Sequence, residues 1–133
     1  FRILRSQFYG NGEYSLNSRK NLPNSVFLQV PFSKVGLTEK QALAEGFEIK
    51  VKEIPAAAVP KLQLEFKTTG LLRAVVDAQT NKILGAALFC YNSPEVINII
   101  KTAIDVNLDY TVLRDQIFTH PTVAESLNDL FNL

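Results

Sequence analysis

The chain of 133 residues contains no methionine, no tryptophan, one cysteine and one histidine. The single cysteine, Cys90, cannot form a disulfide within the chain or supply a cysteine-based metal cage. No apolar run approaches the roughly 20 residues that a membrane-spanning helix needs. The net charge is +1, with acidic and basic residues interspersed, so the basic patch typical of nucleic-acid binding is missing. We therefore expect no metal site, no membrane span and no nucleic-acid partner.

The residues that are present give the composition of a globular protein, with 47% hydrophobic and 20% charged residues. The length supports one domain with one core. Because the chain begins at Phe1 without an initiator residue, we expect a processed product or an excised domain. Cys90 ends the apolar run 86–90, which predicts a buried and inert thiol.

Hydrophobic periodicity predicts an α+β domain, in which an antiparallel sheet has helices packed on one face. The runs suited to strands are 26–30, 33–37, 47–54, 71–76 and 83–90. The runs suited to helices are 1–8, 38–45, 93–105, 109–116 and 122–131. Ser93 is the predicted N-cap of its helix, with Pro94 at the first helical position. Gly85 indicates a bulge or a close backbone approach within its strand.

The stretch Ile117–Phe131 carries the only histidine, His120, directly before Pro121. One interpretation of this stretch is structural, because Thr122 and Glu125 have the spacing of a capping box. The apolar residues that follow form one stripe of a helix: Val123, Leu127, Leu130 and Phe131. His120 is then only the residue that precedes a helix.

The second interpretation is chemical. Proline disfavours the helical conformation in the residue before it, so the ring of His120 projects from a fixed point ahead of the helix. The first helical turn brings the carboxylate of Glu125 back towards this ring. A carboxylate on one ring nitrogen fixes the tautomer and leaves the other nitrogen free to transfer a proton. Both interpretations can hold together, but the carboxylate must then divide its lone pairs between the cap and the ring.

The run HPTVAE at 120–125 resembles the C-terminal His-Pro-Thr-x-x-Glu motif of the pyridine nucleotide-disulfide oxidoreductases. These FAD-dependent enzymes include glutathione reductase, dihydrolipoamide dehydrogenase and mercuric reductase. Residues 35–39, VGLTE, followed by Ala42, resemble a second segment of the family. Residues 69–85, with Thr69-Gly70, Asp77 and Ile83-Leu84-Gly85, resemble its TG…D…ILG hairpin. The lead-in RDQIFTHP and the early segment YGNGEYSLNSRKNLPNSVF most resemble a bacterial branch that includes hypothiocyanous acid reductases.

The resemblance covers only the C-terminal interface domain of these enzymes, because the chain has no GxGxxG turn and no redox-active cysteine pair. It assigns residues 1–12 to a helix and linker from the preceding flavin-binding portion, and 13–133 to the dimerisation domain. It implies a cytoplasmic homodimer in cell redox homeostasis, which uses FAD and NAD(P)H to reduce a small disulfide or oxidant. The fragment itself is expected to bind no cofactor and to be inactive alone.

The resemblance also implies roles for single residues. By position, His120 is the acid/base that exchanges a proton with a thiol of the partner subunit, and Glu125 orients it. The bond between His120 and Pro121 is expected to be cis, and the backbone of these two residues to face the partner's FAD. The substrate and the choice between NADH and NADPH depend on residues outside this sequence.

Two alternatives stay open. The chain could be a free-standing dimerising or scaffold module without catalysis. His120 and Cys90 could instead form a hydrolase pair, although no third group that would orient such a nucleophile is evident.

Overall fold

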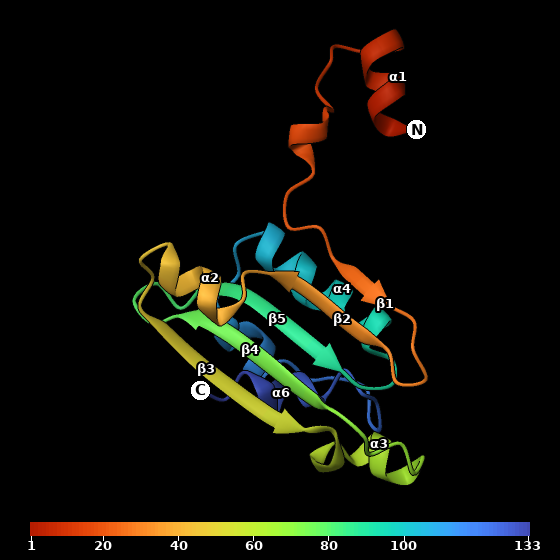
Figure 1. Cartoon of the computed structure of the whole chain (residues 1–133), viewed down its shortest axis with the longest axis vertical. Coiled ribbons are helices and arrows are strands. Elements are labelled where there is room, and N and C mark those ends of the chain that lie inside the picture. Colours follow the sequence, from red (N-terminus) through yellow and green to blue (C-terminus); the bar gives the residue numbers. More distant parts are fainter.

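Five antiparallel strands form one sheet in the order β1-β2-β5-β4-β3 in the computed structural model, which describes all residues 1–133 (Figure 1). The strands are β1 (Asn24–Val26), β2 (Phe32–Gly36), β3 (Ile49–Pro55), β4 (Leu71–Asp77) and β5 (Ile83–Phe89). The helices are α1 (Arg2–Tyr9), α2 (Glu39–Ala44), α3 (Pro60–Leu64), α4 (Ser93–Asp105), α5 (Tyr110–Asp115) and α6 (Ser126–Leu130). Two 3₁₀ turns are η1 (Leu16–Ser18) and η2 (Ala56–Ala58). The predicted α+β class is confirmed.

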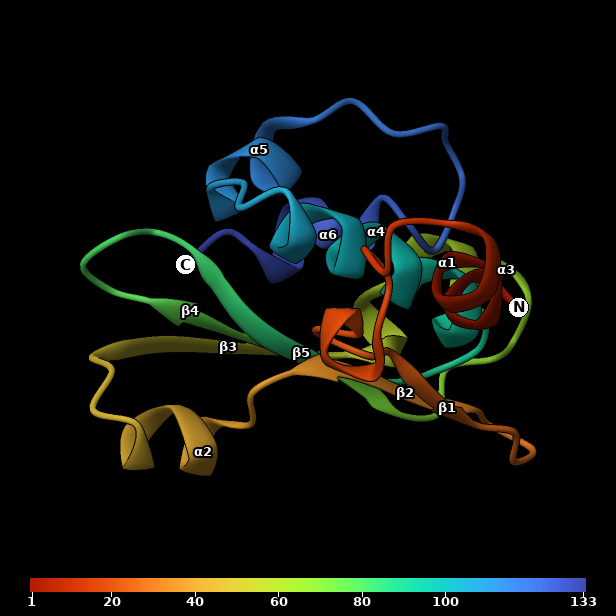
Figure 2. The same ribbon diagram turned by 90° about the horizontal axis from the view of Figure 1, so that it is seen from above.

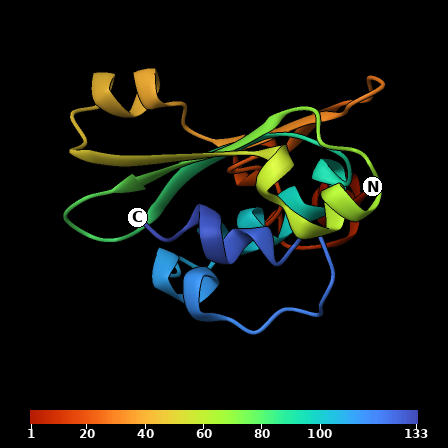
Figure 3. The same ribbon diagram turned by 90° about the horizontal axis from the view of Figure 1, so that it is seen from below.

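The helices α4, α5 and α6 cover one face of the sheet (Figures 2 and 3). The short helix α2 lies on the opposite face, where it covers only part of the strands. Helix α1 and η1 form an arm that extends away from the sheet (Figure 1). None of the helices has the length and apolar character that crossing a membrane requires.

The core lies between the sheet and the α4–α6 layer. Strand β4 contributes Leu72, Ala74 and Val76, all 0% exposed, because alternate side chains of a strand point to the same face. Cys90 belongs to the same buried cluster and is also 0% exposed, which confirms the predicted buried thiol. The apolar stripe predicted at the C-terminus is fully incorporated into this core: Val123, Leu127, Leu130 and Phe131.

The strand predicted at 26–30 is wrong. β1 ends at Val26, which pairs with Phe32 of β2, so residues 27–31 form the loop of a hairpin. Phe27 and Leu28 are 80% and 60% exposed in this loop. The apolar, β-branched composition suits a strand, but Pro31 has no N–H for a ladder and the chain reverses before it. The apolar side chains of the loop are therefore not buried within this chain.

The N-cap predicted at Ser93 is also wrong. Asn92 is the N-cap of α4, in a left-handed conformation with φ 61°, and Ser93 is the first helical residue. Its buried hydroxyl donates to the carbonyl of Pro31 over 3.1 Å and lies 3.0 Å from Oγ of Ser33. These partners come from the β1–β2 hairpin, so no local pattern indicates them. Pro94 lies in the first turn of α4, one position later than predicted, because Ser93 is itself the first helical residue.

The close approach predicted at Gly85 is present. A Cβ on this residue would lie 2.1 Å from the backbone oxygen of Leu37, which is too close for a non-bonded contact. The register of β4 against β5 also shifts between Val75 and Val76, opposite Gly85. The missing side chain therefore lets the end of β2 cross the sheet and lead into α2.

Candidate functional site

The segment between α5 and α6 presents His120 at the surface, with 75% of its side chain exposed. Helix α5 ends at Asp115, and the chain leaves it in extended conformation at Gln116. The peptide bond between His120 and Pro121 is cis, as expected. A cis proline allows a tight turn, so the chain reverses here and enters α6.

The ring of His120 is bound to Glu125. Its Nδ1 lies 2.9 Å from Oε2 and 3.2 Å from Oε1 of the carboxylate. An ionised carboxylate only accepts hydrogen bonds, so Nδ1 carries the proton and donates it. The carboxylate is sheltered, at 15% exposure of the Glu125 side chain, whereas the far edge of the ring faces outward. In the neutral ring, Nε2 is then an exposed acceptor that can take up a proton.

The same carboxylate also holds the turn. The N–H of Thr122 donates to Oε2 of Glu125 over 3.4 Å, and Oγ1 of Thr122 accepts from the N–H of Glu125 over 3.3 Å. These are the reciprocal bonds of the predicted capping box. The predicted helix start is nevertheless wrong, because α6 begins only at Ser126. The N–H groups of Ser126 and Leu127 bond three residues back, so a tighter turn precedes the helix.

A hollow of about 420 Å³ lies beside this pair. Its lining combines the approach to His120 with one side of α6: Pro60, Gln116, Ile117, Phe118, His120, Glu125, Ser126, Asn128 and Asp129. Sequence reasoning does not single out Asn128, which lines the hollow and whose amide contacts three backbone carbonyls. The available signal is an asparagine directly beside the apolar stripe of this helix, because the side-chain amide of asparagine tends to bond nearby backbone groups.

Cys90 contributes nothing to this surface. Burial raises the pKa of its thiol to about 12 from an ordinary 9.0. A thiol with no exposed surface and so high a pKa presents no nucleophile to the outside at neutral pH. The hydrolase pair of His120 and Cys90 therefore has no support in the structure.

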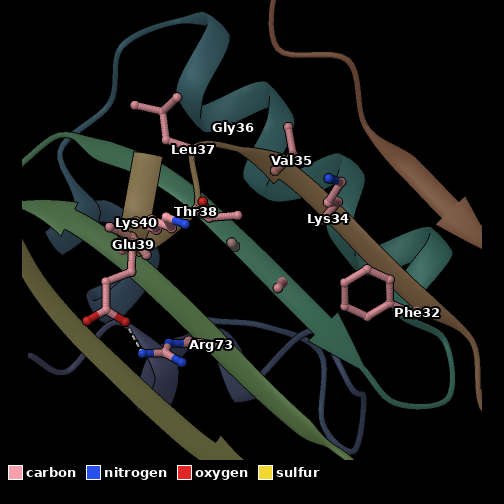
Figure 4. A pocket seen from close by; sticks show the side chains of 12 residues that line it. Phe32, Lys34, Val35, Gly36, Leu37, Thr38, Glu39, Lys40 and Arg73 are labelled. Atoms are coloured by element: carbon pink, nitrogen blue, oxygen red, sulfur yellow. Dashed lines mark hydrogen bonds and ion pairs between the residues drawn. The ribbon is translucent and has the colours of Figure 1, made fainter. Parts of the chain in front are cut away.

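A second hollow, of about 320 Å³, lies on the outer face of the sheet beside α2 (Figure 4). Arg73 from β4 forms an ion pair with Glu39 at one end of it, and Lys34 and Lys40 line its length. The hollow contains no histidine, cysteine or paired carboxylates, and no group of side chains in the chain is arranged to hold a metal ion. The turn at His120, which pairs a histidine with a carboxylate, is therefore the candidate site for acid–base chemistry.

The sequence matches the family described as "Pyridine nucleotide-disulphide oxidoreductase, dimerisation domain" over residues 22–131. A relative from Escherichia coli strain K12, "Probable pyridine nucleotide-disulfide oxidoreductase RclA", is 50% identical over 133 residues, which are 100% of this chain and 30% of the relative. The mercuric reductase of Bacillus cereus is 36% identical over 115 residues, 84% of this chain and 18% of that protein. The chain thus spans less than a third of these relatives.

Solved structures agree with the sequence relatives. The HOCl-induced flavoprotein disulfide reductase RclA from Escherichia coli has a TM-score of 0.95 at 50% identity, over 99% of this chain and 30% of that chain. LpdA from Mycobacterium tuberculosis, at 14% identity, has a TM-score of 0.77 over 83% of this chain and 24% of that chain, and so shares the fold. The fold, the residues matched and these identities together place the chain in one family: it belongs to the dimerisation domains of the pyridine nucleotide-disulphide oxidoreductases.

Proposed function

We propose that the chain works within an FAD-dependent, NAD(P)H-linked disulfide oxidoreductase, where His120 and Glu125 act as an acid–base pair on the partner subunit's dithiol. The observation that carries the proposal is the contact of 2.9 Å between Nδ1 of His120 and the sheltered carboxylate of Glu125. It leaves Nε2 as the exposed, proton-accepting atom of the site.

The proposed step is a proton exchange. Nε2 of His120 takes the proton of a partner thiol, and the resulting thiolate attacks one sulfur of the substrate disulfide. A new S–S bond forms, the substrate S–S bond breaks, and the departing sulfur takes the proton back from Nε2. During the step the ring is a cation, and the carboxylate of Glu125 stabilises it. When bound in the whole enzyme, FAD would supply the electron transfer from NAD(P)H that reduces the partner's disulfide back to the dithiol.

The chain offers a bound flavin one backbone contact surface and no binding pocket. It contains no glycine-rich turn that could hold a pyrophosphate, so it supplies no FAD pocket. The backbone N–H and C=O of His120 make no hydrogen bond within the chain. The backbone groups of His120 are free to contact a flavin ring that another subunit holds, and Pro121 beside them has no N–H that would need a partner. We therefore assign His120 and Pro121 to a backbone contact with the partner's FAD.

The domain boundary is part of the same proposal. We assign residues 1–12 to a helix and linker from the preceding flavin-binding portion, and 13–133 to the dimerisation domain. Phe1, the N-cap of α1, and Phe8 on α1 are 91% and 75% exposed, which suits a helix whose apolar face packs on a portion outside this chain. A small disulfide or oxidant is the proposed substrate, supported by the relative's description as an HOCl-induced disulfide reductase. Dithiol chemistry with NAD(P)H suits the reducing cytoplasm.

The test is made in the parent enzyme with His120→Gln and Glu125→Gln. We expect His120→Gln to lower the rate of disulfide reduction by about 100- to 10,000-fold, the usual contribution of a general acid–base group. Reduction of the flavin by NAD(P)H should continue, because that step needs no proton from His120. Glu125→Gln should cause a smaller loss, since the ring keeps a neutral hydrogen-bond partner.

Thr119→Ala is the matched control on the same turn, because the Thr119 side chain makes no hydrogen bond. Full activity of His120→Gln would sink the proposal. A parent that starts near Phe1 and binds no flavin would instead favour the scaffold alternative.

A further inference from the structure

The approach to His120 has few attachments to the rest of the molecule. None of the N–H groups of residues 117–120 makes a hydrogen bond within the chain. Ile117 is 96% exposed, and only Phe118 packs in part against the core. At its end the segment is held by the turn, where Oγ1 of Thr122 donates to the carbonyl of Thr119 over 2.7 Å. The direction in which the segment approaches this turn depends on what holds it at its start.

The amide of Asn128 holds the start of the segment. Nδ2 of Asn128 lies 3.0 Å from the carbonyl of Leu113, 2.9 Å from that of Arg114 and 2.9 Å from that of Gln116. The last carbonyls of a helix have no partner inside the helix, and here two of them belong to the end of α5. The third belongs to the first residue of the extended segment. One amide thus closes α5 and fixes the direction in which the chain leaves it.

Asn128 and Glu125 are carried by the same rigid unit. Asn128 lies in α6 between Leu127 and Leu130, which are both 0% exposed and anchor the helix in the core. Glu125, three residues before Asn128, is the N-cap of α6 and bonds the ring of His120. The start of the segment that leads to His120 and the carboxylate that bonds its ring are therefore both attached to α6.

We infer that Asn128 is a positioning residue for His120: by tying the end of α5 and Gln116 to α6, its amide sets the ring within reach of the Glu125 carboxylate. The inference rests on the proposed function of His120 for its catalytic consequence. Its structural consequence concerns the chain alone and can be measured without any activity.

The experiment measures the ring nitrogens of His120 by ¹⁵N NMR in the 133-residue chain, where the only histidine gives unambiguous signals. Asn128→Leu removes the amide and keeps the side-chain size. We expect the wild type to hold the neutral ring with its proton on Nδ1. In the variant we expect a lower share of this tautomer and broadened ring signals, because the ring leaves the carboxylate for part of the time.

Asn98→Leu is the matched control, because Nδ2 of Asn98 also donates to a backbone carbonyl, that of Pro94 at 2.8 Å, on the exposed side of α4. This control should leave the signals of His120 unchanged. If Asn128→Leu does not fold by circular dichroism, Asn128→Ala removes the amide donors without adding a charge. A lower melting temperature with unchanged His120 signals in the folded Asn128 variant would overturn the inference, because the amide would then be only structural.

The parent enzyme separates this inference from the proposed function. There we expect Asn128→Leu to lower kcat by about 10- to 100-fold, the size of loss that a misplaced catalytic group causes. KM should change much less than kcat, because the amide of Asn128 is already bonded to three backbone carbonyls. If His120→Gln retains full activity while Asn128→Leu still disturbs the ring, the proposed function fails and the positioning role stands. If Asn128→Leu leaves both the ring and kcat unchanged, the positioning role fails alone.

Discussion

Glu125 combines the two tasks between which the sequence predicts that its carboxylate must divide its lone pairs. Its Oε2 receives the ring of His120 at 2.9 Å and the N–H of Thr122 at 3.4 Å. The shorter and better contact is the one to the ring, so the chemical task takes the stronger share of the lone pairs. The cap bond is long, and the chain compensates with a tight turn before α6. One residue can thus define both the entry to a helix and the tautomer of a histidine.

Cys90 makes a residue-scale prediction about alkaline pH. Its folded pKa is about 12, above the ordinary 9.0 that it regains on unfolding. Below pH 9 both states keep the proton, so the contribution of this thiol to stability is constant. Between pH 9 and 12 the unfolded state releases the proton and the folded state does not. The free energy of unfolding should therefore fall over this range, by up to about 1.4 kcal/mol per pH unit from this group.

The measurement is urea unfolding at several pH values from 8 to 11, for the wild type and Cys90→Ala. Tyrosines and lysines titrate in both proteins, so only the difference between the two slopes reports on the thiol. Cys90→Ala should start less stable, because it leaves a small cavity, and should lose stability less steeply as the pH rises. Equal slopes would mean that the thiol ionises without penalty in the folded protein.

Among the elements, those defined by local patterns were predictable from the sequence. The strand β3, the hairpin of β4 and β5, and the helices α4 and α5 follow from periodicity. The turn at His120 followed from its motif. The errors are Ser93, residues 26–30 and the start of α6, and two of them have long-range causes. Ser93 finds buried partners from a distant hairpin, and the loop 27–31 depends on where β2 pairs. The contacts of Asn128 to α5 could not be predicted either, because they join residues 14 and 15 positions apart in the sequence.

The corrected role of Ser93 makes an element-scale prediction. Oγ of Ser33 lies between Oγ of Ser25 at 2.8 Å and Oγ of Ser93 at 3.0 Å, so a chain of hydroxyls joins β1, β2 and α4. An N-cap serine would stabilise only its own helix, so the losses in free energy of unfolding from Ser93→Ala and Ser33→Ala would be additive. We expect instead that Ser33→Ala and Ser93→Ala are coupled by about 0.5–1.5 kcal/mol, because removing one hydroxyl leaves the other without its partner.

A double-mutant cycle on the free energy of unfolding measures this coupling. Ser33→Ala combined with Thr38→Ala is the control pair, because Thr38 is the N-cap of α2 and does not touch Ser33. The control pair should be additive within about 0.5 kcal/mol. Additivity of Ser33→Ala and Ser93→Ala would restore the purely local role of Ser93.

Many large apolar side chains of the molecule are exposed and do not pack into its core. Several of the large side chains left uncovered lie on the α1 arm, on the β1–β2 hairpin and on the approach to the site: Phe1, Leu4, Phe8, Phe27, Leu28 and Ile117. Isolated exposed hydrophobic residues are normal, but groups of them on projecting segments indicate surfaces made for contact. This pattern agrees with a dimerisation domain that spans 30% of a larger relative.

We therefore predict that the chain associates with itself through the surface that carries Ile117 and His120. Ile117 is 96% exposed, so Ile117→Asp should leave the melting temperature of the monomer unchanged while it places a charge in the interface. We expect the dimer dissociation constant to rise about tenfold or more, the effect of losing one apolar anchor. Sedimentation velocity over a range of concentrations measures the constant for the wild type and the variant.

Leu43→Asp is the matched control for this surface. Leu43 is 55% exposed on α2, which lies on the opposite face of the sheet from α5 and α6 (Figures 2 and 3). Its substitution adds the same charge without reaching the proposed interface, so the dissociation constant should not change. If both variants weaken the dimer equally, net charge rather than a specific surface controls association. A wild-type chain that stays monomeric at the highest concentration would assign dimerisation to portions of the parent outside these 133 residues.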